Sequence, residues 1–105
     1  MIIEFDKDYL HELYTEGKTS DKKHRYQPEV IRGYQKAVFV LSSANAVTDL
    51  FQNNALNYEV LKGDKKDISS VRINKQYRLE FTVRNVMNEQ IVTVCRLLDI
   101  SNHYK

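Results

Sequence analysis

The spacing between apolar residues changes partway along this chain, and that change constrains the fold more than any other feature. Between Pro28 and Ser43 the apolar residues recur three or four positions apart, which is the period of an amphipathic helix. In "SSVRINKQYRLEFTVR", residues 69–84, apolar and polar residues alternate, which is the period of a half-buried strand. The sequence therefore predicts helices first and strands afterwards.

Helical spacing and end signals predict two helices after a short opening strand, "MIIEF". Asp6 is a candidate cap for the first helix, and Gly17 is a candidate stop. Pro28 begins the second helix, which ends near "SSANA". Gly33 inside it costs about 1 kcal/mol relative to alanine, which close packing against another element would explain. The polar segment between the helices, "KTSDKKHR", is predicted to be a mobile loop.

The second half of the chain predicts strands joined by short turns. Residues 47–57 favour a short helical turn followed by a loop, and the alternating segment favours two strands with a tight turn near residues 74–76. "VMNEQ" is the next turn, and "IVTVCRLLDI" is apolar on both faces, as in a central strand. The expected architecture is a single α+β domain, residues 1–105, with the helices packed on one face of a small, mainly antiparallel twisted sheet.

Composition and cysteine usage exclude several classes of protein. Cys95 is the only cysteine, so no disulfide forms within the chain, and its apolar neighbours predict a buried, inert thiol. No stretch approaches the roughly 20 apolar residues of a membrane helix, and the N-terminus lacks the pattern of a secretion signal. A cytoplasmic protein with no membrane association is expected.

The charges are unevenly distributed, although the formal net charge is only +2. Residues 1–16 hold five acids and one base, whereas the remainder holds 15 bases and nine acids. If the alternating apolar residues face the helices, Arg72, Arg78 and Arg84 share the opposite face of the sheet. Such a face either binds the phosphates of a single-stranded RNA or is a solvated surface whose arginines pair with Glu80 and its neighbours. Composition alone favours the second interpretation.

The segment "LNYEVLKGDKKDISSVRINKQYRLEF", residues 56–81, resembles the HigB branch of the RelE/ParE toxin superfamily, the toxin halves of bacterial type II toxin–antitoxin pairs. The spacing of "LKGD", "VRIN" and "YRLEF" is the specific part of the resemblance, which extends to most of the chain. It implies a RelE-like fold and ribosome-dependent cleavage of messenger RNA, in which a ribose 2′-hydroxyl attacks the adjacent phosphate without a metal or another cofactor.

The resemblance also implies roles for individual residues. Lys62 matches an active-site lysine, and Arg78 matches a strand arginine that holds phosphate. Glu59 stands where relatives can carry histidine, and it is either the general base or a structural partner of the cations. The tail "LDISNHYK" supplies Asp99, His103 and Tyr104 in an order that departs from the usual aspartate–tyrosine–histidine cluster. Further candidates for RNA contacts are Lys65, Lys66, Arg72, Lys75 and Arg84.

The implied partners are a cognate HigA-like antitoxin with a helix-turn-helix domain, the 70S ribosome and messenger RNA. Operator DNA would be bound only through the antitoxin. Two alternatives remain at this point: a ParE-like toxin that inhibits DNA gyrase without cutting RNA, and a nonenzymatic chain that only binds an antitoxin. The "KTSDKKHR" loop and the lysines after Gly63 are the candidate contacts with the ribosome.

Overall fold

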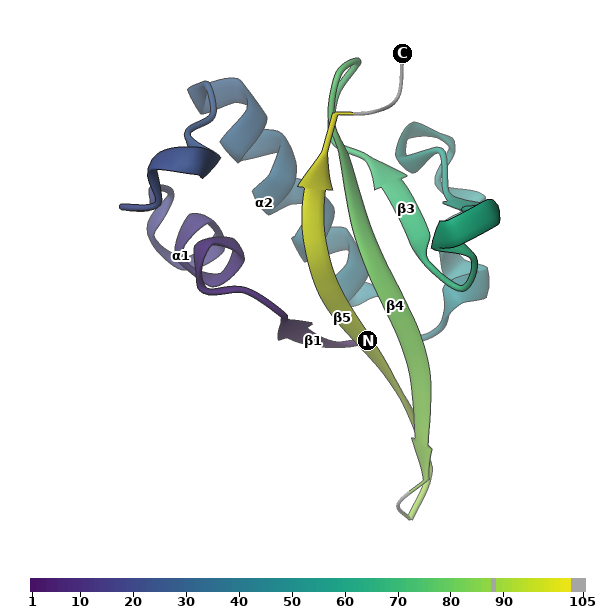
Figure 1. The fold of residues 1–105 in the computed structure, drawn as a ribbon. Coiled ribbons are helices and arrows are strands. Elements are labelled where there is room, and N and C mark those ends of the chain that lie inside the picture. The colour runs from purple at the N-terminus through teal and green to yellow at the C-terminus, as the bar shows by residue number, and fades with distance from the viewer. Residues whose placement is uncertain (88, 103–105) are drawn as a thin grey trace.

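The chain folds into one twisted sheet with two long helices packed against it (Figure 1). The structure is a computed structural model, and it describes residues 1–87 and 89–102. The helices are α1 (Asp8–Glu16) and α2 (Pro28–Ser43), with short 3₁₀ helices η1 (Lys22–His24), η2 (Val47–Gln52), η3 (Asn54–Leu56) and η4 (Gly63–Lys65). The strands are β1 (Ile2–Phe5), β2 (Glu59–Val60), β3 (Ser69–Arg72), β4 (Arg78–Met87) and β5 (Ile91–Ser101).

The strand order across the sheet is β1-β5-β4-β3-β2. β1 runs parallel to β5, and all the other neighbours are antiparallel. β3 pairs with residues 78–81 of β4, and β1 pairs with residues 94–97 of β5, so the rest of the β4–β5 hairpin extends as a ribbon beyond the body (Figure 1). Leu98 is an extra residue in β5, a bulge beside Glu80 and Phe81 of β4.

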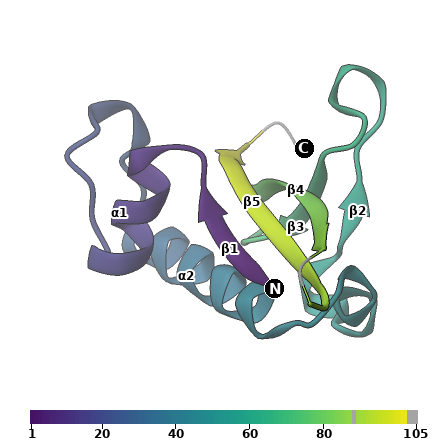
Figure 2. The same cartoon turned by 90° about the horizontal axis from the view of Figure 1, so that it is seen from below.

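The apolar face of the sheet packs on the helices, as the alternation predicts. Val71, Leu79 and Phe81 are fully buried in one core with residues of α1 and α2. Seen along a perpendicular direction, α1 and α2 lie together on one side of the sheet (Figure 2). Tyr34 of α2 is buried in this core, and its hydroxyl donates to the carbonyl of Leu10 in α1 at 2.7 Å.

Gly33 permits the closest contact between α2 and the sheet layer. A Cβ atom at this position would lie 3.0 Å from Cγ2 and 3.1 Å from the carbonyl oxygen of Ile73. The close packing expected from the helix glycine is therefore confirmed. Gly17, with φ of 73°, ends α1 in the left-handed conformation, and Pro28 stands in the first turn of α2, as predicted.

The α+β class and the order of the main elements are confirmed, but two local predictions are wrong. Asp6 does not cap α1: the cap position is Lys7, and the Asp6 carboxylate instead accepts hydrogen bonds from Arg96. The segment after Gly17 is not an unanchored loop, because it contains η1 and the His24 ring stacks on Tyr9 with centroids 3.6 Å apart. Nothing in the local sequence specifies this stacking, which joins residues 15 positions apart.

Candidate active site

The face of the sheet opposite the helices carries the candidate site. The register places Arg72 opposite Arg78 and Ser70 opposite Glu80 between β3 and β4. It places Glu80 opposite Asp99 between β4 and β5. Because directly opposed residues of antiparallel strands project from the same side of a sheet, these side chains share one surface. Glu59 joins them from β2, where it lies opposite Ser70.

Arg78 is the buried cation of this face, with its side chain 7% exposed. Its Nε donates to the hydroxyl of Ser70 at 2.9 Å, and its Nη2 donates to the carbonyls of Asn57 at 2.5 Å and Ser70 at 3.2 Å. The Glu59 carboxylate lies 3.5 Å from Nε, and its side chain is 46% exposed. The result is a guanidinium held at the floor of the face beside a carboxylate that is accessible to solvent.

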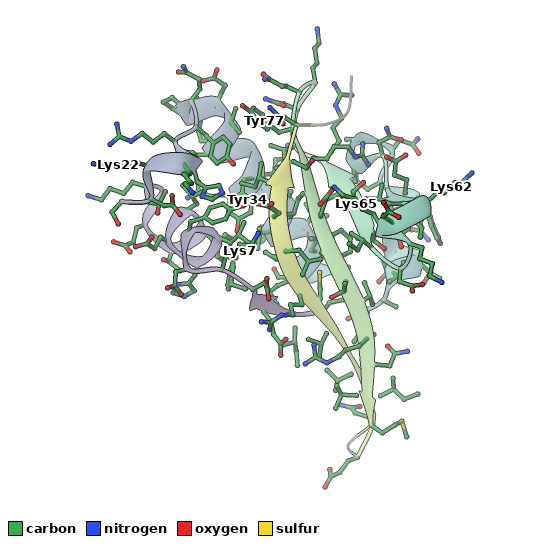
Figure 3. The ribbon with its side chains drawn as sticks, viewed as in Figure 1. Lys7, Lys22, Tyr34, Lys62, Lys65 and Tyr77 are labelled. Carbon is green, nitrogen blue, oxygen red and sulfur yellow. The ribbon has the colours of Figure 1, made fainter. Side chains whose placement is uncertain are left out.

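Two lysines of the β2–β3 connection have different surroundings. The ammonium of Lys65 lies over the sheet and donates to Glu80 at 2.9 Å (Figure 3). Lys62 is exposed and points away from the sheet (Figure 3). The structure therefore brings Lys65 to the face that carries Arg78, whereas it does not bring Lys62 there.

A second polar cluster lies beside Asp99 in β5. The Tyr9 hydroxyl donates a hydrogen bond to the Asp99 carboxylate and accepts one from the amide of Ile100 at 3.1 Å. Burial, together with the hydrogen bond to Asp99, raises the pKa of Tyr9 far above its usual range, so the phenol stays protonated. The Lys7 ammonium lies 3.4 Å from the other oxygen of Asp99.

Arg84 belongs to an ion-pair network at a different part of the face. It donates to both carboxylate oxygens of Glu4, at 3.0 and 2.9 Å, and Arg96 bridges Glu4 to Asp6. These hydrogen bonds, led by those from Arg84, lower the pKa of Glu4. At Arg84 the geometry is that of an ion-paired surface arginine, because its guanidinium already makes two hydrogen bonds to one carboxylate.

The remaining candidates are scattered or lie outside the described residues. Lys66 and Lys75 are exposed, and Arg72 is exposed with its Nε donating to the carbonyl of Asn74 at 3.2 Å. His103 and Tyr104 fall outside the residues that the structure describes. Cys95 is buried, which raises the pKa of its thiol to about 12 and agrees with the predicted inert role.

Sequence reasoning missed Ser70 and Asn57, which hold Arg78, and it missed Lys7. Ser70 carried a signal, because it has the same parity as Arg72 in the alternating segment and thus faces the same side. Asn57 and Lys7 reach the site through tertiary contacts over 21 and 92 positions, for which no local pattern exists. Within residues 1–87 and 89–102, no three His, Cys, Asp or Glu side chains are grouped as metal ligands. No helix in this part of the chain is long and apolar enough to cross a membrane.

Comparison with known proteins shows the family to which the chain belongs. Residues 3–95 match the model of HigB-like toxins, described as the RelE-like toxin of the type II toxin–antitoxin system HigB. The chain is 36% identical over 85 residues to Toxin HigB-1 of Vibrio cholerae, covering 77% of this chain and 82% of that protein. It is also 30% identical over 81 residues to an uncharacterized protein of Haemophilus influenzae, covering 77% of each.

Solved structures show the same fold at low identity. A YoeB/ParE toxin from Agrobacterium tumefaciens superposes with a TM-score of 0.54 at 17% identity, covering 99% of this chain and 100% of that chain. YafQ from E. coli superposes with a TM-score of 0.52 at 9% identity, covering 96% and 91%. The resemblance of the "LKGD", "VRIN" and "YRLEF" segments is confirmed by the family match. This chain therefore belongs to the HigB-like family of RelE-type toxins of type II toxin–antitoxin systems.

Proposed function

We propose that this toxin is an endoribonuclease that cuts messenger RNA held in the decoding site of the ribosome and so inhibits translation. The observation that supports the proposal best is the guanidinium of Arg78, which Ser70 and Asn57 fix beside the exposed carboxylate of Glu59. A rigid cation next to an accessible base is what cleavage of a phosphodiester by its own ribose requires.

In the proposed reaction the 2′-hydroxyl oxygen attacks the adjacent phosphorus, and Glu59 accepts the hydroxyl proton. The bond from phosphorus to the 5′-oxygen breaks, and the leaving oxygen takes a proton from a general acid, for which His103 is the candidate. The products are a 2′,3′-cyclic phosphate and a 5′-hydroxyl. Arg78 stabilises the negative charge that accumulates on the phosphate oxygens, and Tyr104 is a further candidate at the same phosphate.

The lysines and the remaining arginines have proposed binding roles. Lys65, which pairs with Glu80 over the sheet, is proposed to contact a phosphate at the Arg78 face. Lys62, proposed as a catalytic lysine, projects away from Lys65, so comparison of alanine variants at these two positions separates their roles. Lys66, Arg72, Lys75 and Arg84 are proposed to contact RNA, although Arg84 must first leave Glu4.

Membership of a type II toxin family implies a protein antitoxin as partner. We propose a HigA-like antitoxin with a helix-turn-helix domain, which represses transcription by binding operator DNA while it holds the toxin. The other partners are the 70S ribosome and its messenger RNA, which places the activity in the cytoplasm.

The test is to map messenger RNA ends during in vitro translation with the wild-type protein. Cuts at codon positions in the decoding site are expected. Arg78→Ala and Glu59→Gln should each lower the cleavage rate by at least about 10²-fold, because positioned acid–base groups typically supply 10²–10⁴-fold. Arg32→Ala, which removes an exposed arginine from α2 on the helix side, serves as the matched control and should cut at the wild-type rate.

The outcomes separate the competing functions. Intact transcripts together with stalled DNA replication would overturn the nuclease proposal and select inhibition of DNA gyrase. Cleavage that survives both Arg78→Ala and Glu59→Gln would show that the nuclease centre lies elsewhere. Intact transcripts with normal replication would leave a chain that only binds its antitoxin.

A further inference from the structure

Two carboxylates stand side by side in the middle of the open face, and each holds a lysine that comes from outside the central strands. Glu80 and Asp99 are direct partners in the β4–β5 register. Lys65 reaches Glu80 from η4, and Lys7 reaches Asp99 from the junction between β1 and α1. Figure 3 shows the two labelled lysines on opposite sides of the β4–β5 pair.

Asp99 is held in a fixed position, so that it can position Lys7 in turn. One carboxylate oxygen accepts from the Tyr9 hydroxyl and from the amide of Ile100, the latter at 3.0 Å. The other oxygen lies 3.4 Å from the Lys7 ammonium. Tyr9 is itself buried, and the His24 ring stacks on it. A charged group supported by this many contacts does not need to be reorganised when a ligand arrives.

Lys7 remains available to a ligand although it has this partner. Its side chain is 45% exposed, nearly the same as the 44% of Lys65. An ammonium has three N–H donors, so a contact with one carboxylate oxygen of Asp99 does not use all of them. Lys7 can therefore approach a phosphate while Asp99 keeps it at the edge of the face.

We propose that Lys7 is an RNA-binding residue of this toxin, which holds a phosphate on the side of the face across β4 and β5 from Lys65. The inference rests on the proposed function, since the ligand is the RNA that Arg78 and Glu59 act on. In this arrangement the RNA backbone crosses the sheet between two lysines, and the scissile phosphate lies toward Arg78. Lys7 makes a binding contact and has no part in proton transfer.

The alternative interpretation is that Lys7 and Asp99 form a surface ion pair with no role in RNA binding. A half-exposed lysine–aspartate pair contributes little to stability, typically less than about 1 kcal/mol, and has no consequence for RNA. The two interpretations differ in salt dependence, because a lysine that neutralises a phosphate adds to the number of counterions that binding releases. For a single strand, one phosphate contact contributes about 0.7 to the slope of log affinity against log salt.

The experiment measures cleavage of ribosome-bound messenger RNA by wild type, Lys7→Ala, Lys7→Arg and Arg32→Ala over a series of salt concentrations. Arg32 is the control, because it is an exposed cation on α2 and is not among the proposed RNA contacts. We expect Lys7→Ala to lower kcat/KM about tenfold through KM, with kcat nearly unchanged and a salt slope shallower by about 0.7. Lys7→Arg should retain most of the activity, and Arg32→Ala should match wild type.

A second measurement separates this inference from the proposed function. The same variants are titrated with a 2′-O-methyl RNA oligonucleotide, which cannot be cut because the attacking hydroxyl is blocked. Weaker binding by Lys7→Ala than by Arg32→Ala supports the role of Lys7 even if the wild type cleaves nothing, in which case the proposed function alone fails. Equal salt slopes and equal affinities for Lys7→Ala and Arg32→Ala would overturn the inference, whether or not the wild type cleaves.

Discussion

At the scale of residues, the site depends on how Arg78 is held. Ser70 is fully buried, and its hydroxyl accepts a hydrogen bond from Nε of Arg78. Ser70→Ala removes this acceptor without changing the strand, so the Nε–H of the buried Arg78 guanidinium loses its hydrogen bond to the hydroxyl. We expect the free energy of unfolding to fall by about 1–3 kcal/mol, measured by urea denaturation, and the rate of RNA cleavage to fall with it.

The control for this prediction is Ser42→Ala. The Ser42 hydroxyl is exposed and donates to the carbonyl of Phe39 within α2. Removing it should change the free energy of unfolding by no more than about 0.5 kcal/mol. If Ser70→Ala were as stable and as active as Ser42→Ala, Ser70 would have no role in positioning the guanidinium.

At the scale of elements, the contact between α2 and the β3–β4 turn determines how a side chain at position 33 changes thermal stability. Alanine at this position would gain up to about 1 kcal/mol of helix propensity. However, its Cβ would lie 3.1 Å from the backbone carbonyl oxygen of Ile73, which cannot move without displacing the turn. Because overpacking costs about 1–3 kcal/mol, we expect Gly33→Ala to lower the thermal midpoint, whereas Arg32→Ala on the exposed side of α2 should leave it unchanged or higher. A higher thermal midpoint for Gly33→Ala than for wild type would show that the β3–β4 turn shifts to accommodate the added methyl group at little cost.

At the scale of the whole molecule, burial of Cys95 in the core should make the free energy of unfolding fall at alkaline pH. Burial raises the pKa of the Cys95 thiol to about 12 from an ordinary value of 9.0. Between these values the unfolded thiol is ionised while the folded thiol keeps its proton. The contribution of this group to stability is therefore complete below pH 9 and is lost as pH rises toward 12.

The measurement is the free energy of unfolding of wild type and Cys95→Ala from pH 8 to pH 11. The slope contributed by one such group reaches about 1.4 kcal/mol per pH unit. The alanine variant should be less stable at pH 8 because of its cavity, and its stability should fall less steeply above pH 9. Tyr26, with its pKa raised by burial to about 12, stays in both proteins and gives them a common residual slope. Parallel curves would contradict this account.

Local chemistry explains which parts of the fold and site were predictable. Gly17 and Pro28 mark helix ends through their own backbone properties, and the alternation around Val71 and Leu79 follows from burial of one face of a strand. Asp6 failed as a cap because a distant arginine, Arg96, takes its carboxylate. When a side chain has several possible partners, the tertiary structure determines which one it pairs with. A local sequence pattern does not contain that information.

The sequence by itself determined the order of elements, the buried face of the sheet, the family and the presence of Arg78 on the open face, because each follows from periodicity or from a contiguous motif. Only the tertiary structure decided that Lys65 lies over the sheet while Lys62 projects away, that Glu4 engages Arg84, and that Asp99 holds Lys7. The physical reason is that ion pairs and hydrogen bonds between distant segments depend on how the chain brings their atoms within a few ångströms. Spacing along the chain does not encode that distance.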